Sequence, residues 1–332
     1  MGTRTIDYND GGTRKIGCDK RSPIDTKEDA VKVSTRLIPC LLGVGLVALP
    51  TNAASADETY HINLSPAAHP GDKFQYIAAQ TMTSNSYDTK GALTAQGSFS
   101  EVDFGSVAEV ESCDAKGRPI RVKFKVQYLQ MPNLGFANLI NPGSEITARN
   151  ALVQNEPPKF TDVFTYKDDP VQPLSAAALR RVVTIGSEKE SSEQEAFGTD
   201  QALPIGGTWP LDGTPGAKLF EKMQLKVDPK DVIGNAQLAG KFFTRDNECL
   251  EVRIEVACDK YQPPVPADQK VEKGKVTGEV IYYIAKDTGR VVESSYRAHE
   301  EFDVSGKRNG VPFTFHTTKD TSRLIKISDA PK

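Results

Sequence analysis

Several segments of the chain alternate strictly between apolar and polar residues. In residues 120–128, Ile, Val, Phe, Val and Tyr occupy one face of an extended chain, and Arg, Lys, Lys and Gln occupy the other. Residues 250–256 repeat this design as Leu-Glu-Val-Arg-Ile-Glu-Val. A period of two predicts a β-strand with one buried face and one solvated face.

Short Asp- and Gly-containing turns separate the extended segments. They lie at residues 88–91, 114–117 and 287–289, and longer loops of the same kind lie at 244–247 and 303–310. Asp can bond its own backbone, and Gly supplies the positive φ that closes a short hairpin loop. Turns at this spacing predict an antiparallel sheet in which neighbours along the chain are neighbours in space.

Helical signals are few. Residues 174–183 are Ala-rich, with Ser175 as the expected N-cap, and Pro215 could open a second helix over residues 217–223. The acidic stretch 188–195 is expected to be a loop or a frayed continuation of the first helix. The predicted fold class is therefore mainly β: an antiparallel meander of hairpins that forms a curled sheet or half-barrel, with one or two short helices.

The N-terminal part of the sequence has the features of a secretory signal. An apolar run over residues 37–50 follows Lys32 and Arg36, and small residues come next, with Ala54 and Ala56 at the positions that a signal peptidase accepts. The run is too short for a membrane-spanning helix, which needs about 20 residues. A buried hairpin or core helix and a retained membrane anchor are the alternatives.

This pattern predicts three regions. Residues 1–32 form a polar extension that a normal signal does not carry, so the true start of translation could lie later; residues 33–56 form the signal peptide; and residues 57–332 form one large β-rich domain. Similar turn sequences suggest that this domain consists of two related halves, at about 57–170 and 198–332. The expected location is periplasmic or secreted, with no stable membrane span after cleavage.

Charge and cysteine content narrow the possible partners. The whole sequence has 41 basic and 44 acidic residues, and no concentrated basic face is visible, which argues against nucleic acid binding. Within residues 57–332 the cysteines are Cys113, Cys249 and Cys258. The last two share one expected strand about 30 Å apart, so an internal disulfide would have to use Cys113. The alternative is that all three are small buried side chains.

The order of motifs resembles a known group of proteins. It comprises an extended start at residues 71–76, the Asp-x-x-Gly hairpins, the segment 203–210, and a Gly-Glu-Val-Ile-Tyr-Tyr strand that leads into residues 287–290. This order is similar to that of large uncharacterised secreted β-proteins of environmental bacteria, including planctomycete-type genomes. It is similar in outline to the half-barrel of periplasmic lipoprotein carriers. The resemblance implies an apolar ligand and no enzymatic activity, and it transfers no site residues.

Catalytic signatures are absent from the sequence. There is no Gly-x-Ser-x-Gly, His-Glu-x-x-His or Cys-x-x-Cys motif, so no catalytic residue and no cofactor is assigned. If the strands that carry His299 and His316 pair, these two side chains and Glu301 are the candidates for a metal site; a solvated cross-strand set is the alternative. Trp209 is expected either to anchor a loop or to stack on a ligand.

Three functions are compatible with these observations. The first is an exported, non-catalytic envelope protein that binds an apolar or amphipathic molecule or a partner chain. The second is a structural or adhesive β-module that adds strands at exposed sheet edges. The third is a carboxylate-based hydrolase that uses Glu300, Glu301 or Asp303 near His299.

Overall fold

A computed structural model describes residues 58–153, 159–186, 192–222, 225–244, 247–308 and 310–331. By its internal contacts the chain divides into residues 1–53 and residues 54–332, and all described residues belong to the second unit. The predicted signal peptide and its cleavage residues, Ala54 and Ala56, lie outside the described residues, so that expectation stays a prediction.

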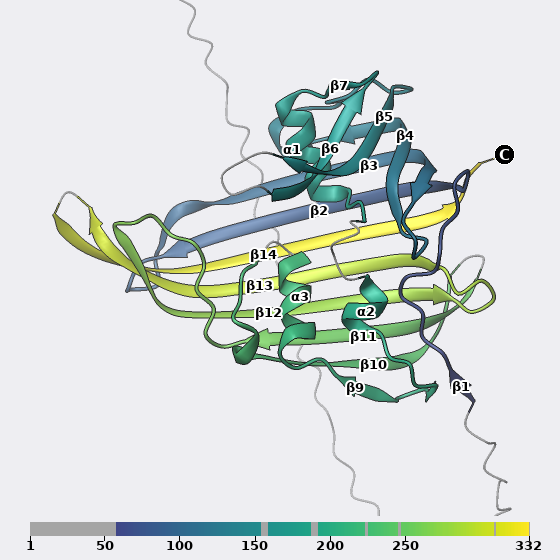
Figure 1. Cartoon of the computed structure of the whole chain (residues 1–332). Coiled ribbons are helices and arrows are strands. Elements are labelled where there is room, and N and C mark those ends of the chain that lie inside the picture. Colours follow the sequence, from purple (N-terminus) through teal and green to yellow (C-terminus); the bar gives the residue numbers. More distant parts are fainter. Residues whose placement is uncertain are drawn as a thin grey trace, which may run out of the picture. The chain divides into compact units, whose positions relative to one another are not determined.

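The described residues are organised around one large antiparallel sheet (Figure 1). The strands are β1 Thr59–Tyr60, β2 Lys73–Tyr87, β3 Leu93–Cys113, β4 Pro119–Gln130, β5 Glu145–Val153, β6 Lys159–Tyr166, β7 Asp169–Pro170, β8 Leu203–Pro204, β9 Thr208–Pro210, β10 Val232–Phe243, β11 Glu248–Cys258, β12 Gln269–Ala285, β13 Val291–Arg308 and β14 Val311–Asp329.

Twelve of these strands form the sheet, in the order β7-β6-β5-β4-β3-β2-β14-β13-β12-β11-β10-β9, while β1 and β8 pair separately. The sheet therefore consists of two meanders, β2–β7 and β9–β14, joined by the antiparallel pairing of β14 with β2. Its outer strands do not pair with each other, so it stays open. The predicted fold class is confirmed, whereas a repeat relationship between the two halves stays a prediction.

The hairpin turns use the predicted chemistry. The Asp88 carboxylate accepts hydrogen bonds from the backbone N–H groups of Lys90 and Ala92, and Gly91 has a φ of +78°. Asp114 and Gly117 repeat this arrangement between β3 and β4, with a φ of +75° at the glycine. The left-handed φ is the reason why glycine is required at both turns.

Three α-helices cover the apolar face of the sheet: α1 Pro173–Val182, α2 Glu193–Phe197 and α3 Thr214–Lys222. Short 3-10 turns occur at η1 Pro132–Leu134 and η2 Pro229–Asp231. Two details differ from the sequence prediction. The N-cap of α1 is Gln172, and Ser175 is buried with its hydroxyl donating to Leu139 O at 3.0 Å.

The second difference is α2, whose first three residues belong to the acidic stretch 188–195, where the sequence predicts a loop or a frayed continuation of the first helix. A capping box starts this helix: Ser192 Oγ accepts from the Glu195 N–H, and the Glu195 carboxylate accepts from the Ser192 N–H. Two backbone donors that would otherwise lack partners are thereby satisfied, which stabilises even a short helix.

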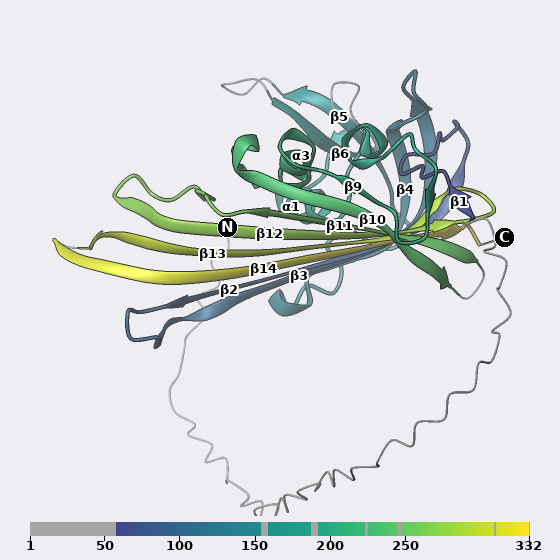
Figure 2. The same cartoon turned by 90° about the horizontal axis from the view of Figure 1, so that it is seen from below.

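Two hydrophobic clusters form on the helix-bearing face, one under each meander. One cluster joins α1 to β2–β6 and includes Phe104, Phe124 and Leu179. The other joins α2 and α3 to β10–β13 and includes Phe197 and Phe220. Figure 2 shows β5 and β6 on the same side as α3, so the sheet curls toward its helices. Side chains of the protein itself therefore fill the apolar face.

The three cysteines of the described unit are free thiols. Cys258 is buried on the apolar face at the end of β11, as the alternating pattern predicts, Cys249 is buried near the start of β11 although it has the opposite parity, and Cys113 is half-buried at the end of β3. No helix within the described part of the chain is long and apolar enough to cross a bilayer.

Candidate functional site

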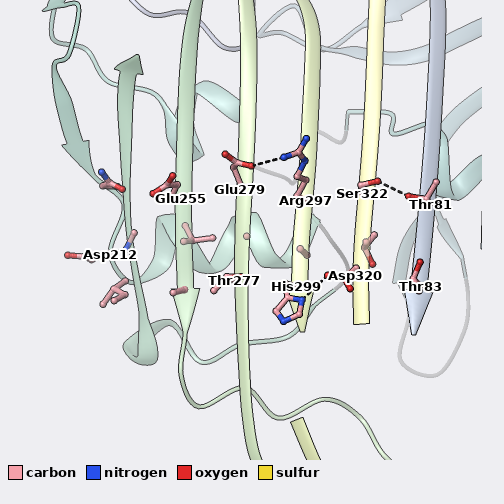
Figure 3. Close-up of a pocket in the computed structure, with 18 residues that line it drawn as sticks. Thr81, Thr83, Asp212, Glu255, Thr277, Glu279, Arg297, His299, Asp320 and Ser322 are labelled. Carbon is pink, nitrogen blue, oxygen red and sulfur yellow. Dashed lines mark hydrogen bonds and ion pairs between the residues drawn. The ribbon is translucent and has the colours of Figure 1, made fainter. Parts of the chain in front are cut away.

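The candidate site is a trough on the polar face of the sheet, opposite the helices. It has a volume of about 800 Å³ and crosses β2 and β10–β14. Figure 3 shows its side chains projecting from the face of the strands that is nearer the viewer, while a helix lies behind the strands. This arrangement follows from the period of two, because each strand that buries one row of side chains presents the alternate row on the other face.

One row of directly opposite residues crosses the whole trough. The antiparallel register pairs each member with the next, in the order Phe99, Thr83, Asp320, His299, Thr277, Ala257 and Ile233. We call this set the floor row. At about 4.8 Å between neighbouring strands, its six steps cover roughly 29 Å. The two ends are exposed apolar side chains, since Phe99 is 49% and Ile233 63% exposed.

Small side chains make the floor row lower than its surroundings. Ala257 and Thr277 are short, and they lie between larger neighbours such as Glu255, Glu279 and Ile233. Gly278, which has no side chain, also lines the trough. The hollow is therefore a product of residue size along adjacent strands.

A second row, parallel to the first, carries most of the charge. It contains Thr81, Ser322, Arg297, Glu279, Glu255 and Asn235, each opposite the next. The hydroxyls of Thr81 and Ser322 share a hydrogen bond of 2.7 Å. Arg297 lies 3.7 Å from the Glu279 carboxylate (Figure 3). We call this set the charged row.

The histidines predicted as metal candidates lie on paired strands, but each faces an aspartate. His299 Nδ1 lies 2.7 Å from Asp320 Oδ1 in the trough. His316 Nδ1 lies 2.9 Å from Asp303 Oδ1, and its Nε2 lies 3.6 Å from Glu301 Oε1. The β13–β14 register thus separates the histidines by four residue pairs.

His316 and Glu301 belong to a smaller hollow of about 470 Å³ beside the trough, which several lysines also line. The described residues contain no group of three or more His, Cys, Asp and Glu side chains that could hold a metal ion. The register thus brings His316 and Glu301 together and places His299 elsewhere.

The carboxylates considered for a hydrolase lie on two faces of the sheet. Glu300 is buried on the helix side, 2% exposed, where its Oε2 accepts from the Tyr261 hydroxyl at 2.7 Å and its Oε1 lies 2.7 Å from Lys319 Nζ. Burial and this carboxylate together raise the pKa of Tyr261. Glu301 and Asp303 lie on the polar face, so the sheet itself separates them from Glu300.

Trp209 anchors a loop. It is 8% exposed, and its indole N–H donates to Phe197 O at 2.8 Å, which links β9 to the end of α2. The side chain belongs to the cluster under β10–β13, on the face opposite the trough. The loop-anchoring alternative is the one that the structure shows.

Comparison with known proteins gives little further information. No family model matches the chain, and no curated protein matches it. Among solved structures, the chain is similar to one described as "Lipid-protein interactions in lipovitellin", with a TM-score of 0.32 and 8% identity. The match covers 80% of this chain but only 26% of that chain, so this chain spans about a quarter of the lipovitellin length.

The trough could not have been found from the sequence without the strand register. The floor row draws its seven members from seven strands, one from each, over positions that range from residue 83 to residue 320. The one local signal is a run of small or hydroxyl residues at polar-face positions of neighbouring strands.

Proposed function

We propose that this chain is an exported, non-catalytic protein that binds an amphipathic molecule in the trough. Export follows from the predicted signal peptide. The observation that supports binding is the floor row, in which the short side chains of Ala257 and Thr277 form a hollow beside the charged row. Exposed apolar side chains end the row, with Ile233 lining the trough and Phe99 one strand beyond it. A surface of this kind provides contact area for an apolar chain and nearby hydrogen-bonding or charged partners for a polar group.

The size of the trough supports a single small ligand. Pockets for small molecules commonly measure about 300–1,000 Å³, and the trough, at about 800 Å³, lies within this range. The apolar face of the sheet is a less suitable place, because the side chains of α1, α2 and α3 fill it.

The experiment uses two tryptophan variants of the exported chain. Thr277→Trp places a large side chain on the trough floor, whereas Thr314→Trp makes the same change at an exposed position of β14, on the same face but outside the trough. Three amphiphiles with one twelve-carbon tail serve as probes below their micelle concentrations: dodecylamine, dodecanoate and dodecyl maltoside. Titration calorimetry gives affinity and stoichiometry.

We expect one molecule of at least one probe to bind per chain. Thr277→Trp should weaken that binding by about tenfold or more, since the bulky ring occupies contact volume in the trough. Thr314→Trp should leave it unchanged. Failure of all three probes to bind, or equal affinity of the two variants, would refute the proposed function.

A further inference from the structure

We infer that the trough takes an amphiphile with a positively charged head group, which lies at the Ile233 end. This inference rests on the proposed function and adds the chemical class and the orientation of the ligand. It is carried by the distribution of charge along the trough, which differs between the two ends.

Negative charge predominates among the residues that line the trough. Asp212, Glu255, Glu279 and Asp320 contribute four carboxylates, and the one permanently charged cation is Arg297. Asp320 is paired with His299. The excess of carboxylates attracts a cation and repels an anionic head group.

The carboxylates concentrate where β10, β11 and β12 meet. Glu255 lies directly opposite Glu279 in the β11–β12 register, and like charges in opposite positions destabilise a sheet. The two arginines of this region form ion pairs with the Glu279 carboxylate, which lies 3.7 Å from Arg297 and 3.9 Å from Arg253. Glu255 is exposed, and its carboxylate has no hydrogen bond or ion pair to any described residue.

Asp212 increases the negative charge at the same end. It is exposed, and its Oδ1 accepts the backbone N–H of Gly234 at 2.8 Å, which fixes the carboxylate beside β10. Figure 3 shows Asp212 and Glu255 on one side of the trough and Thr81 and Thr83 on the other. A cation between Asp212 and Glu255 would compensate charge that the protein itself leaves uncompensated.

The opposite end suits an uncharged tail. Thr81 and Ser322 satisfy each other by a hydrogen bond of 2.7 Å, and exposed Phe99 ends the floor row there. A chain along the floor row would thus have its head near Ile233 and its tail directed toward Phe99, which ends the row about 29 Å away.

The floor favours an amphiphile over an extended basic peptide. Peptides that add to sheets bond to the free backbone groups of an edge strand. The strands beneath the trough, β11–β14 and β2, each pair on both sides, so their backbone groups already have partners. A ligand lying across them contacts side chains only, which suits a flexible hydrocarbon chain.

The test compares the same three probes, because they share a tail and differ in the head group. Dodecylamine should bind at least about fivefold more tightly than dodecyl maltoside, and dodecanoate more weakly than both. The ratio of the affinities of dodecylamine and dodecyl maltoside should fall as salt is raised from 20 to 300 mM, since salt screens exposed charges. The double variant Asp212→Asn/Glu255→Gln should weaken dodecylamine binding by about two- to fivefold per carboxylate and leave maltoside binding unchanged.

A matched control locates the effect. Glu109→Gln removes a carboxylate from the same face of β3, beside Lys73 and outside the trough, and should not alter any affinity. Equal binding of the three probes, or tighter binding of dodecanoate, would overturn the inference while the proposed function stands. The assigned class of ligand, a cationic amphiphile, would also be overturned if an oligolysine peptide displaced dodecylamine and bound more tightly than dodecylamine does. If none of the three probes binds, both proposals are refuted.

Discussion

The buried Tyr261–Glu300–Lys319 cluster allows a quantitative test of the fold. Tyr261 and Glu300 are each 2% exposed, and their side chains are joined by a hydrogen bond of 2.7 Å, while Lys319 is 31% exposed at the edge of the cluster. The change Tyr261→Phe removes one hydroxyl and keeps the ring. A hydrogen bond to a charged group contributes about 1.5–3 kcal/mol, so we expect the free energy of unfolding to fall by that amount.

The measurement is equilibrium unfolding in urea. Trp209 is the single tryptophan and belongs to the same hydrophobic cluster as Tyr261, so its fluorescence reports on this region, with circular dichroism for the whole sheet. The slope of free energy against urea should not change, which would show that the variant alters stability and not compactness.

Two further variants make the test specific. In a Glu300→Gln background the acceptor is neutral, so Tyr261→Phe should cost only about 0.5–1.5 kcal/mol. Tyr166→Phe, at a side chain that is 42% exposed, should change stability by about 0.5 kcal/mol or less. The reasoning is refuted if Tyr261→Phe costs no more than Tyr166→Phe, or costs the same with either residue at position 300.

Three other predictions use the same unfolding assay. Gly274→Ala should cost about 1–3 kcal/mol, because a Cβ there would overlap Tyr261 O; a neutral result would show that the β11–β12 loop can move away. Ser192→Ala should cost about 1 kcal/mol by removing the cap of α2, and no change would mean that α2 adds nothing to stability. Stability should fall as pH rises above about 10, since burial raises the pKa of Tyr282 and Tyr296 in the folded state and the unfolded chain therefore ionises first; an equal urea midpoint at pH 8 and 10.5 would contradict this.

Local patterns predicted several of the strands and the helix α1. The alternation over residues 120–128 and 250–256 corresponds to β4 and β11, and the Ala-rich segment 174–183 corresponds to α1 within one residue at each end. These predictions succeed because side-chain period and turn chemistry act over a few residues. The loop or frayed continuation predicted over 188–195 was wrong for residues 193–195, which belong to α2, because the Ser192 and Glu195 capping box starts a separate helix there.

The candidate site depends on long-range register, which no local pattern contains. The sequence places His299 and His316 on strands, yet only the β13–β14 pairing shows that each faces an aspartate. The small residues Ala257 and Thr277 become a trough floor only because β11 and β12 align them. A shift of one residue would put both on the other face, so this site could not be predicted from composition or motif.

The position of β14 has a consequence for how the protein is made. It is the last strand in chain order, yet it lies in the interior of the sheet between β13 and β2, and no other described strand links the two meanders. Synthesis from the N-terminus thus produces β2 long before β14, its partner in the sheet, has been made. Until then the edge of β2 has unpaired backbone groups that can bond to a strand of another chain. A chaperone that shields this edge until residue 329 has emerged would protect the nascent chain from aggregation.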